Sequence, residues 1–415
     1  MFLQRQHLFL LPLPYIKSAN MFLVISLCII ILIVGLGCSQ KNILSPSIIT
    51  GAVWLACLLM FLFMDHDLPK LKTQTFITIS VWIFFFSISS LCTQACNYSK
   101  SLLDSPSLLI RNLYLAISIL TYPLLLLFAY KAITLGTTGN WALDLRMAAL
   151  GATETFDKPF ESFYILFWNV SFFLELIAFK KKKYVRLVII SFIFLSYGFL
   201  TMSKIIIASS FIMAVVILHF KHIFKTKHLV YSISFLIFIL ILIQTLRHPS
   251  IHSEDSLIVY TFGNLSSFET VKPGTSVHFG ENTFRIVYAV LHSLYLSPIE
   301  PINPLLPWIK DPLTTNTYTG LYPFYKDFGI WGVGIFAVIL GGLGGWVYKK
   351  ALSGNNFYIS LYAHLMFIIL LQFDAESFLT NFSRNVKFIL LLAIPFFCTK
   401  HNLLYLKEKI THGKQ

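Results

Sequence analysis

The sequence predicts an all-α polytopic membrane protein with about eleven (10–12) transmembrane helices and one large external loop that carries short helices. Of its 415 residues, 56% are hydrophobic and only 12% are charged, and the mean hydropathy is +0.74. A soluble domain carries about 25% charged residues. Many runs of about 20 residues contain no Asp, Glu, Lys or Arg, which is the length of a helix that crosses a bilayer. This pattern excludes a soluble enzyme, a nucleic-acid-binding domain and a disordered chain.

Eleven apolar segments are long enough, or nearly so, to span the hydrocarbon core. In chain order they are Met21–Gly37, Ile43–Met64, Phe76–Leu91, Leu108–Tyr130, Phe160–Phe179, Leu187–Thr201, Ile205–Phe220, Leu229–Leu246, Gly329–Tyr348, Phe357–Phe373 and Val386–Cys398. The start of the chain leaves two alternatives open, because Met21 stands directly before the first span and competes with Met1 as the true start. The orientation of the first twenty residues also stays open.

Basic residues are concentrated in connections that alternate to one side of the membrane. They are Lys180–Lys183 with Arg186, Lys221 with Lys225 and Lys227, Lys349 with Lys350, and the lysines of the tail. Since basic loops stay in the cytoplasm, this side and the C-terminus are predicted to be cytoplasmic. We therefore expect eight spans over residues 1–246, a lid-like loop over 247–328, three spans over 329–399 and a basic tail over 400–415. Residues 131–159 and 374–385 form the other external connections.

The long external loop has its own predicted structure. Apolar residues recur at helical spacing between Asn282 and Leu296, which predicts an amphipathic helix that lies on the membrane surface. Four prolines between Pro298 and Pro307 then favour an extended path. Long loops on a rigid scaffold commonly carry function, so this lid is the first place to look for a site.

Four cations occupy separate external connections, where positive charge is disfavoured. They are Arg146, Lys204, Arg285 and Arg384. An ordinary alternative exists for three of them: an ion pair with Asp144 for Arg146, a lysine that extends to the interface for Lys204, and an interfacial anchor for Arg384. The functional hypothesis is that all four bind one anionic ligand, a lipid pyrophosphate, whose oxygens arginine binds in pairs.

The candidates for acid–base chemistry are His278, Glu281 and Asp327. His278 and Glu281 are three residues apart and would share a face if the lid helix began early. Asp327 is equally suited to cap the following helix. The sequence does not choose among the three.

Other candidate motifs are weaker. Asn316, Tyr318, Thr319 and Tyr325 lie in an aromatic stretch that suits either a membrane-interface belt or sugar faces. The six cysteines lie in or beside apolar runs and have neither zinc spacing nor a disulfide pattern. The glycines of Gly341–Gly345 lie inside a span, where close helix packing explains them better than nucleotide binding. No metal or cofactor is expected.

The stretch Asn316-Thr-Tyr-Thr-Gly320, followed by Tyr325-Lys-Asp-Phe-Gly-Ile-Trp-Gly332 and a glycine-rich span, resembles the bacterial oligosaccharide repeat-unit polymerases, the Wzy or O-antigen polymerase family. Leu145-Arg146 and Thr201-Met-Ser-Lys204 agree with this resemblance. Relatives often have arginine where this chain has Lys204, which keeps the charge but loses the planar fork.

The resemblance implies a metal-independent, inverting glycosyltransferase of the bacterial inner membrane. Such an enzyme transfers a growing glycan from undecaprenyl pyrophosphate to a lipid-linked repeat unit at the periplasmic face. Arg146, Lys204, Arg285 and Arg384 would bind the pyrophosphate, and Glu281, His278 or Asp327 would act as the base. A co-polymerase that regulates chain length would be a partner. The alternatives are an O-antigen ligase, which shares this layout, and a flippase or transporter for the same lipid-linked sugar, which should carry its charges at mid-membrane.

Overall fold

The computed structural model describes residues 19–39, 42–63, 68, 71–96, 105–156, 163–179, 184–224, 263–303, 306, 307, 309 and 315–398, with isolated positions between 231 and 246. The regular secondary structure of this part of the chain is helical, and two isolated β-bridges lie in its turns and loops. Its helices are α1 (Ala19–Cys38), α2 (Pro46–Phe63), α3 (Thr73–Ala95), α4 (Leu108–Thr134), α5 (Trp141–Leu150), α6 (Phe163–Ile177), α7 (Val185–Leu200), α8 (Lys204–Phe220), α11 (Arg285–Ser293), α12 (Tyr322–Leu352), α13 (Asn356–Leu370), the 3₁₀ turn η1 (Leu371–Phe373) and α14 (Phe382–Phe397).

The apolar helices confirm a helical membrane protein. Within the described residues, six helices are long and apolar enough to cross a membrane, namely α1 to α4, α12 and α13 with η1, and α6, α7 and α8 are shorter apolar helices. The helices overlap ten of the eleven predicted spans. The remaining one, Leu229–Leu246, lies mostly outside the described residues, as do most of residues 1–20 and the whole of the tail 400–415. The number of spans therefore stays a prediction.

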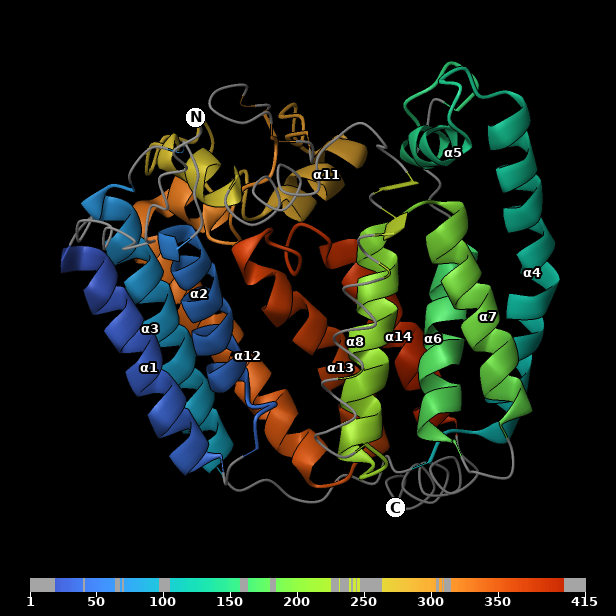
Figure 1. The fold of residues 1–415 in the computed structure, drawn as a ribbon, viewed down its shortest axis with the longest axis horizontal. Coiled ribbons are helices and arrows are strands. Elements are labelled where there is room, and N and C mark those ends of the chain that lie inside the picture. Colours follow the sequence, from blue (N-terminus) through green and yellow to red (C-terminus); the bar gives the residue numbers. More distant parts are fainter. Residues whose placement is uncertain are drawn as a thin grey trace, which may run out of the picture.

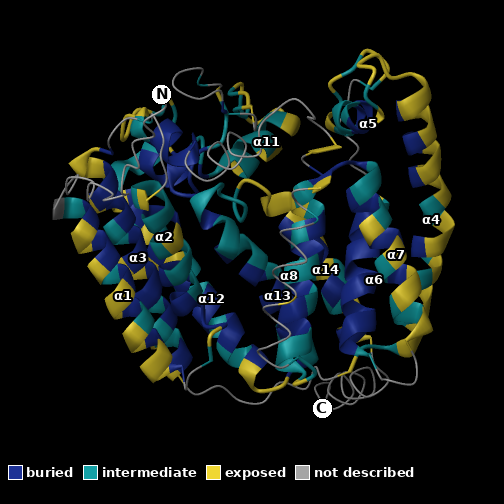
Figure 2. Cartoon of the chain, viewed as in Figure 1, coloured by how far each residue is buried: buried dark blue, intermediate teal, exposed yellow. Residues whose placement is uncertain are grey.

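The outer surface of the bundle is apolar where a bilayer would surround it. Figure 2 shows exposed residues along the outward sides of α1, α4 and α7 and buried residues on their inward sides. On α4, for example, the Leu120 side chain is 77% exposed. By contrast α6 is buried almost throughout, with Trp168 and Phe173 fully enclosed. A large continuous apolar surface of this kind is typical of contact with lipid.

Two packed cores divide the bundle. One lies among α1, α2, α3 and α12, and the other among α4, α6, α7, α8, α13 and α14 (Figure 1). In the first core, α12 crosses α3 through glycines: a Cβ atom on Gly341 would lie 2.3 Å from the Phe86 carbonyl oxygen, and one on Gly345 would lie 2.3 Å from that of Ser90. The prediction of close helix packing at Gly341–Gly345 is confirmed.

The start of α12 differs from the predicted span, which begins at Gly329. Helix α12 begins at Tyr322 and is kinked at Gly329, where φ is 61° and ψ is −149°. This conformation is accessible to glycine and strained for any other residue. The kink separates a short helical segment, which carries Lys326 and Asp327, from the apolar part of the helix. The charged residues thereby stay at the end of the bundle.

The lid also differs in detail from its prediction. The amphipathic helix is α11, which spans Arg285–Ser293 instead of 282–296. It begins later because residues 276–284 form turns that the Asp327 and Glu281 carboxylates hold. It ends before Tyr295, whose φ is +57°. Residues 263–269 add a second helical segment. Residues 247–262 of the predicted lid lie outside the described part.

A group of charged residues lies at the opposite end from α11. The Glu175 carboxylate, at the end of α6, is buried and accepts two hydrogen bonds from Arg111, at 3.1 and 3.0 Å. Arg186, at the start of α7, lies 2.9 Å from the same carboxylate. This network joins α4, α6 and α7 on the side that the basic loops predict to be cytoplasmic.

Candidate functional site

A cavity of about 220 Å³ lies between the lid, the first turn of α12 and the loop that follows η1. Its polar walls include Asn282, Arg285, Asn303, Asn316, Tyr318 and Thr319. Four of these, Arg285, Asn316, Tyr318 and Thr319, are residues that the sequence predicted for a site. The structure therefore brings residues about thirty positions apart in the lid to one cavity at one end of the bundle (Figure 1).

Arg285 is the cation of this cavity. It is the first residue of α11, and its Nε donates a hydrogen bond to the Ile302 carbonyl oxygen at 2.7 Å, which fixes the guanidinium against the extended segment of the lid. Among the described residues no carboxylate forms an ion pair with it. A half-buried guanidinium without a counter-ion is suited to bind an anionic group of a ligand.

Neutral polar groups line the same cavity. The Thr319 side chain is fully buried, and its Oγ1 has no hydrogen-bond partner in the part of the chain that the structure describes. The Tyr318 hydroxyl donates to the Pro307 carbonyl oxygen at 3.2 Å, and burial raises its pKa. The ring of Tyr318 lies 4.8 Å from that of Tyr322. Hydroxyl, amide and aromatic groups together suit a ligand that is rich in hydroxyls.

The Glu376 carboxylate was not among the predicted site residues, yet it lines this cavity. It accepts hydrogen bonds from the backbone N–H groups of Phe378 (2.7 Å), Leu379 (2.8 Å) and Thr380 (2.6 Å), and from the Thr380 hydroxyl (2.9 Å). Burial raises the pKa of Glu376, and these four hydrogen bonds oppose that shift. The carboxylate therefore folds its own loop into a tight turn beside the cavity.

A second contact holds the loop 374–381 from the other side. The Asn385 Nδ2 donates to the carbonyl oxygens of Ser377 (3.0 Å) and Phe378 (2.9 Å), and its Oδ1 lies 3.0 Å from Nε2 of His364 on α13. This segment was predicted as a plain external connection. It is instead packed against the bundle, and the signal that sequence reasoning missed was a pair of acids, Asp374 and Glu376, directly after an apolar span.

Two of the predicted base candidates serve as structural groups. Asp327 accepts hydrogen bonds from the Asn282 side chain (2.6 Å), the Thr283 N–H (2.7 Å) and the Ser276 hydroxyl. It therefore anchors the turn before α11, which is neither the cap nor the base that the sequence left open for it. Glu281 accepts from the backbone N–H groups of Val277 and His278, both at 3.1 Å.

His278 and Glu281 do not share a helical face, because α11 begins only at Arg285. The His278 ring lies 6.4 Å from the ring of Tyr288 and forms no hydrogen bond within the described residues. Of the three base candidates, none lines the cavity, but His278 keeps its ring nitrogens available.

The other three predicted cations lie on elements at the same end of the bundle and do not line this cavity (Figure 1). Arg146 is on α5, Lys204 begins α8, and Arg384 is exposed in the first turn of α14. The alternative for Arg146, an ion pair with Asp144, is not found among the described residues; the Asp144 carboxylate is buried and accepts the Thr138 N–H at 3.0 Å.

Tyr325 belongs to the core. Its side chain is buried, and its ring lies 5.1 Å from that of Phe268 in the helical segment 263–269. It therefore anchors the lid to α12 and does not face the cavity. The described residues contain no group of three or more His, Cys, Asp or Glu side chains that could hold a metal ion.

Comparisons with known proteins identify no relative: no family model, curated protein or solved structure matches this chain.

Proposed function

We propose that this chain is a polymerase of lipid-linked oligosaccharide repeat units. In this proposal it transfers a growing glycan from undecaprenyl pyrophosphate to a second lipid-linked unit, at the periplasmic end of an eleven-span bundle in the bacterial inner membrane. The observation that carries the proposal is the polar cavity beside the lid, where Arg285 meets Asn316, Tyr318 and Thr319 of the stretch that resembles the polymerase family.

The chemistry of the cavity supports a glycan that is joined to an anion. Arg285 would hold a phosphate oxygen of the donor and stabilise the negative charge that develops as the pyrophosphate leaves. The amides of Asn303 and Asn316 and the hydroxyl of Thr319 would orient sugar hydroxyls. Arg146, Lys204 and Arg384 lie outside the cavity and would act on parts of the long substrate that extend beyond it.

The acceptor hydroxyl needs a base, and the proposal assigns this role to His278. A neutral imidazole has one unprotonated ring nitrogen that can accept a proton from a hydroxyl group. His278 lies four residues before Asn282, which lines the cavity. The carboxylates of Asp327 and Glu281 already accept hydrogen bonds from backbone and side-chain donors. The lid would exclude water from the reacting groups.

The test is a deletion of the gene, complemented with variants and followed by a gel of the cell's lipopolysaccharide. The deletion is expected to leave core with a single repeat unit, and the natural chain to restore the ladder of long chains. Arg285→Ala should fail to restore it at normal levels of membrane protein. Lys272→Ala is the matched control, because it removes an exposed lid cation outside the cavity.

Two outcomes of the same gel would overturn the proposal. Core without any repeat unit in the deletion strain would indicate a ligase or a flippase. A normal ladder in the strain that carries Arg285→Ala would remove the cavity from the reaction.

A further inference from the structure

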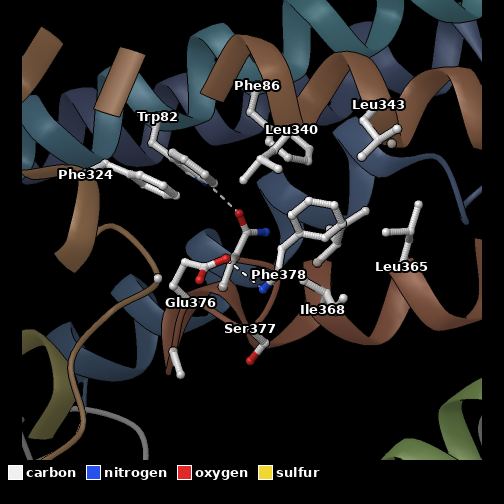
Figure 3. Close-up of a pocket in the computed structure, with 15 residues that line it drawn as sticks. Trp82, Phe86, Phe324, Leu340, Leu343, Leu365, Ile368, Glu376, Ser377 and Phe378 are labelled. Carbon is white, nitrogen blue, oxygen red and sulfur yellow. Dashed lines mark hydrogen bonds between the residues drawn. The ribbon is translucent and has the colours of Figure 1, made fainter. Parts of the chain in front are cut away.

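A second, apolar pocket lies inside the bundle next to the polar cavity. Figure 3 shows its walls, which come from α3 (Trp82, Phe86), α12 (Leu340, Leu343) and α13 (Leu365, Ile368). The Trp82 ring stacks on Phe324 with centroids 5.8 Å apart, and its Nε1 donates to the Gln372 Oε1 at 2.7 Å. The Trp82 and Gln372 side chains are therefore paired with each other, and the pocket, about 50 Å³ in volume, is lined mainly by apolar side chains.

The two spaces share a wall. Ala375 and Glu376 line both the polar cavity and the apolar pocket. Because the Glu376 and Asn385 hydrogen bonds hold this loop, the wall is a fixed feature and not a loose connection. A polar space that contains Arg285 thus adjoins an apolar space between α3, α12 and α13, which are long and apolar enough to cross a membrane.

We propose that the apolar pocket binds the phosphate-proximal part of the lipid carrier's isoprenoid chain, while the pyrophosphate and sugar occupy the polar cavity. This inference rests on the proposed function and adds a binding site for the tail. The order of the two spaces matches the order of chemical groups along such a lipid, which runs from sugar through diphosphate to hydrocarbon. Because a lipid tail in the bilayer is already out of water, the gain would come from close packing of the tail against the apolar walls of the pocket.

Phe378 sets the size of this site. In Figure 3 its ring projects from the loop into the space between Leu340 and Ile368. Phe378 lines the apolar pocket and not the polar cavity, so its ring limits the space that a hydrocarbon chain can occupy there.

The test uses the purified full chain in phospholipid nanodiscs and a short isoprenyl diphosphate with a photoreactive diazirine on its first isoprene unit. Illumination should label the loop 374–381 or α13. Leu343→Trp fills the pocket and removes the packing contacts of one isoprene unit, so binding of the probe should weaken by about tenfold. Ile335→Trp is the matched control: it adds the same side chain to the same helix on its outward, 57% exposed face.

Ile368→Phe provides a second, smaller filling variant if Leu343→Trp fails to fold. Equal labelling of the natural chain and either folded filling variant would overturn the inference, as would labelling confined to the outward face of α12.

Inorganic pyrophosphate, which has no tail, separates this inference from the proposed function. If the function holds, pyrophosphate competes with the probe in the natural chain and binds equally to Leu343→Trp. Retained pyrophosphate binding with unchanged probe affinity in Leu343→Trp would contradict the tail site alone. Loss of competition by pyrophosphate in every chain would contradict the proposed function.

Discussion

The Asp327 carboxylate has a structural role that depends on the groups around it: it holds the turn before α11. Its carboxylate accepts the Thr283 N–H and the Asn282 side chain, so it fixes the start of α11 and with it Arg285. Each hydrogen bond to a charged group contributes about 1.5–3 kcal/mol. We therefore predict that Asp327→Ala speeds hydrogen exchange at the amides of Asn282 and Thr283 and leaves α1 to α3 unchanged. The neighbouring Lys326→Ala should not change it. Equal exchange in both variants would contradict this role.

The buried carboxyl of Asp374 should make the stability of the folded chain depend on pH. Burial raises the pKa of its carboxyl from the usual 3.8 to about 6, and Oδ1 has no hydrogen-bond partner among the described residues. Between about pH 4 and pH 6 the folded chain therefore holds a proton that the unfolded chain has lost, so stability falls as the pH rises, by at most about 3 kcal/mol.

Asp374→Asn should remove this dependence and raise the melting temperature at pH 7, as measured in detergent at a series of pH values. A melting temperature of the natural chain that rises from pH 4 to pH 6 would show the sign to be wrong.

Individual site residues were partly predictable from the sequence. The sequence singled out Arg285 because positive charge is disfavoured in external connections of membrane proteins. In the structure Arg285 lines the cavity. Glu376 was missed because its role depends on backbone N–H groups of its own turn, and the sequence does not show which backbone groups point inward. The hypothesis that four cations gather around one anion went further than the sequence allows: topology places them at one end without fixing their separations, and only Arg285 lines the cavity.

At the scale of elements, the kink in α12 positions the lid. Gly329 has φ 61°, and a Cβ atom there would meet only Pro273, at an ordinary 3.5 Å. The cost of Gly329→Ala is therefore conformational, about 1–3 kcal/mol. We predict a clearly lower melting temperature for Gly329→Ala. Gly334→Ala, in the regular part of the same helix with contacts no closer than 3.5 Å, should be neutral or stabilising. Equal effects of the two variants would contradict a strained kink.

Regular elements were predicted better than connections. Ten apolar segments overlap helices, because in a bilayer a helix satisfies all of its backbone hydrogen bonds within the segment. Helix α5 and the packed loop 374–381 were not predicted, since each depends on side-chain caps: Asn140 accepts the Ala142 N–H at the start of α5, and Glu376 organises the loop. Short polar motifs of this kind are common in turns and do not mark an element on their own.

At the scale of the whole molecule, charge asymmetry predicts the orientation. The lid lies at one end of the bundle, and the α12–α13 turn, flanked by Lys349 and Lys350, lies at the other (Figure 1). In a chain whose native cysteines are replaced, we predict that Tyr295→Cys, at a 96% exposed position, reacts with an impermeant maleimide in cells with a permeabilised outer membrane. Ser353→Cys, also exposed, should react only after lysis. The reverse pattern would invert the topology.

The central claim is that the protein joins lipid-linked glycans in the cavity beside α11. The most direct test supplies the purified chain in liposomes with a single substrate, an undecaprenyl-pyrophosphate-linked repeat unit. The account predicts stepwise products of two, three and more units, made by the natural chain and by Lys272→Ala but not by Arg285→Ala. Products of equal length from Arg285→Ala, or a natural chain that moves the substrate across the bilayer without lengthening it, would contradict the account.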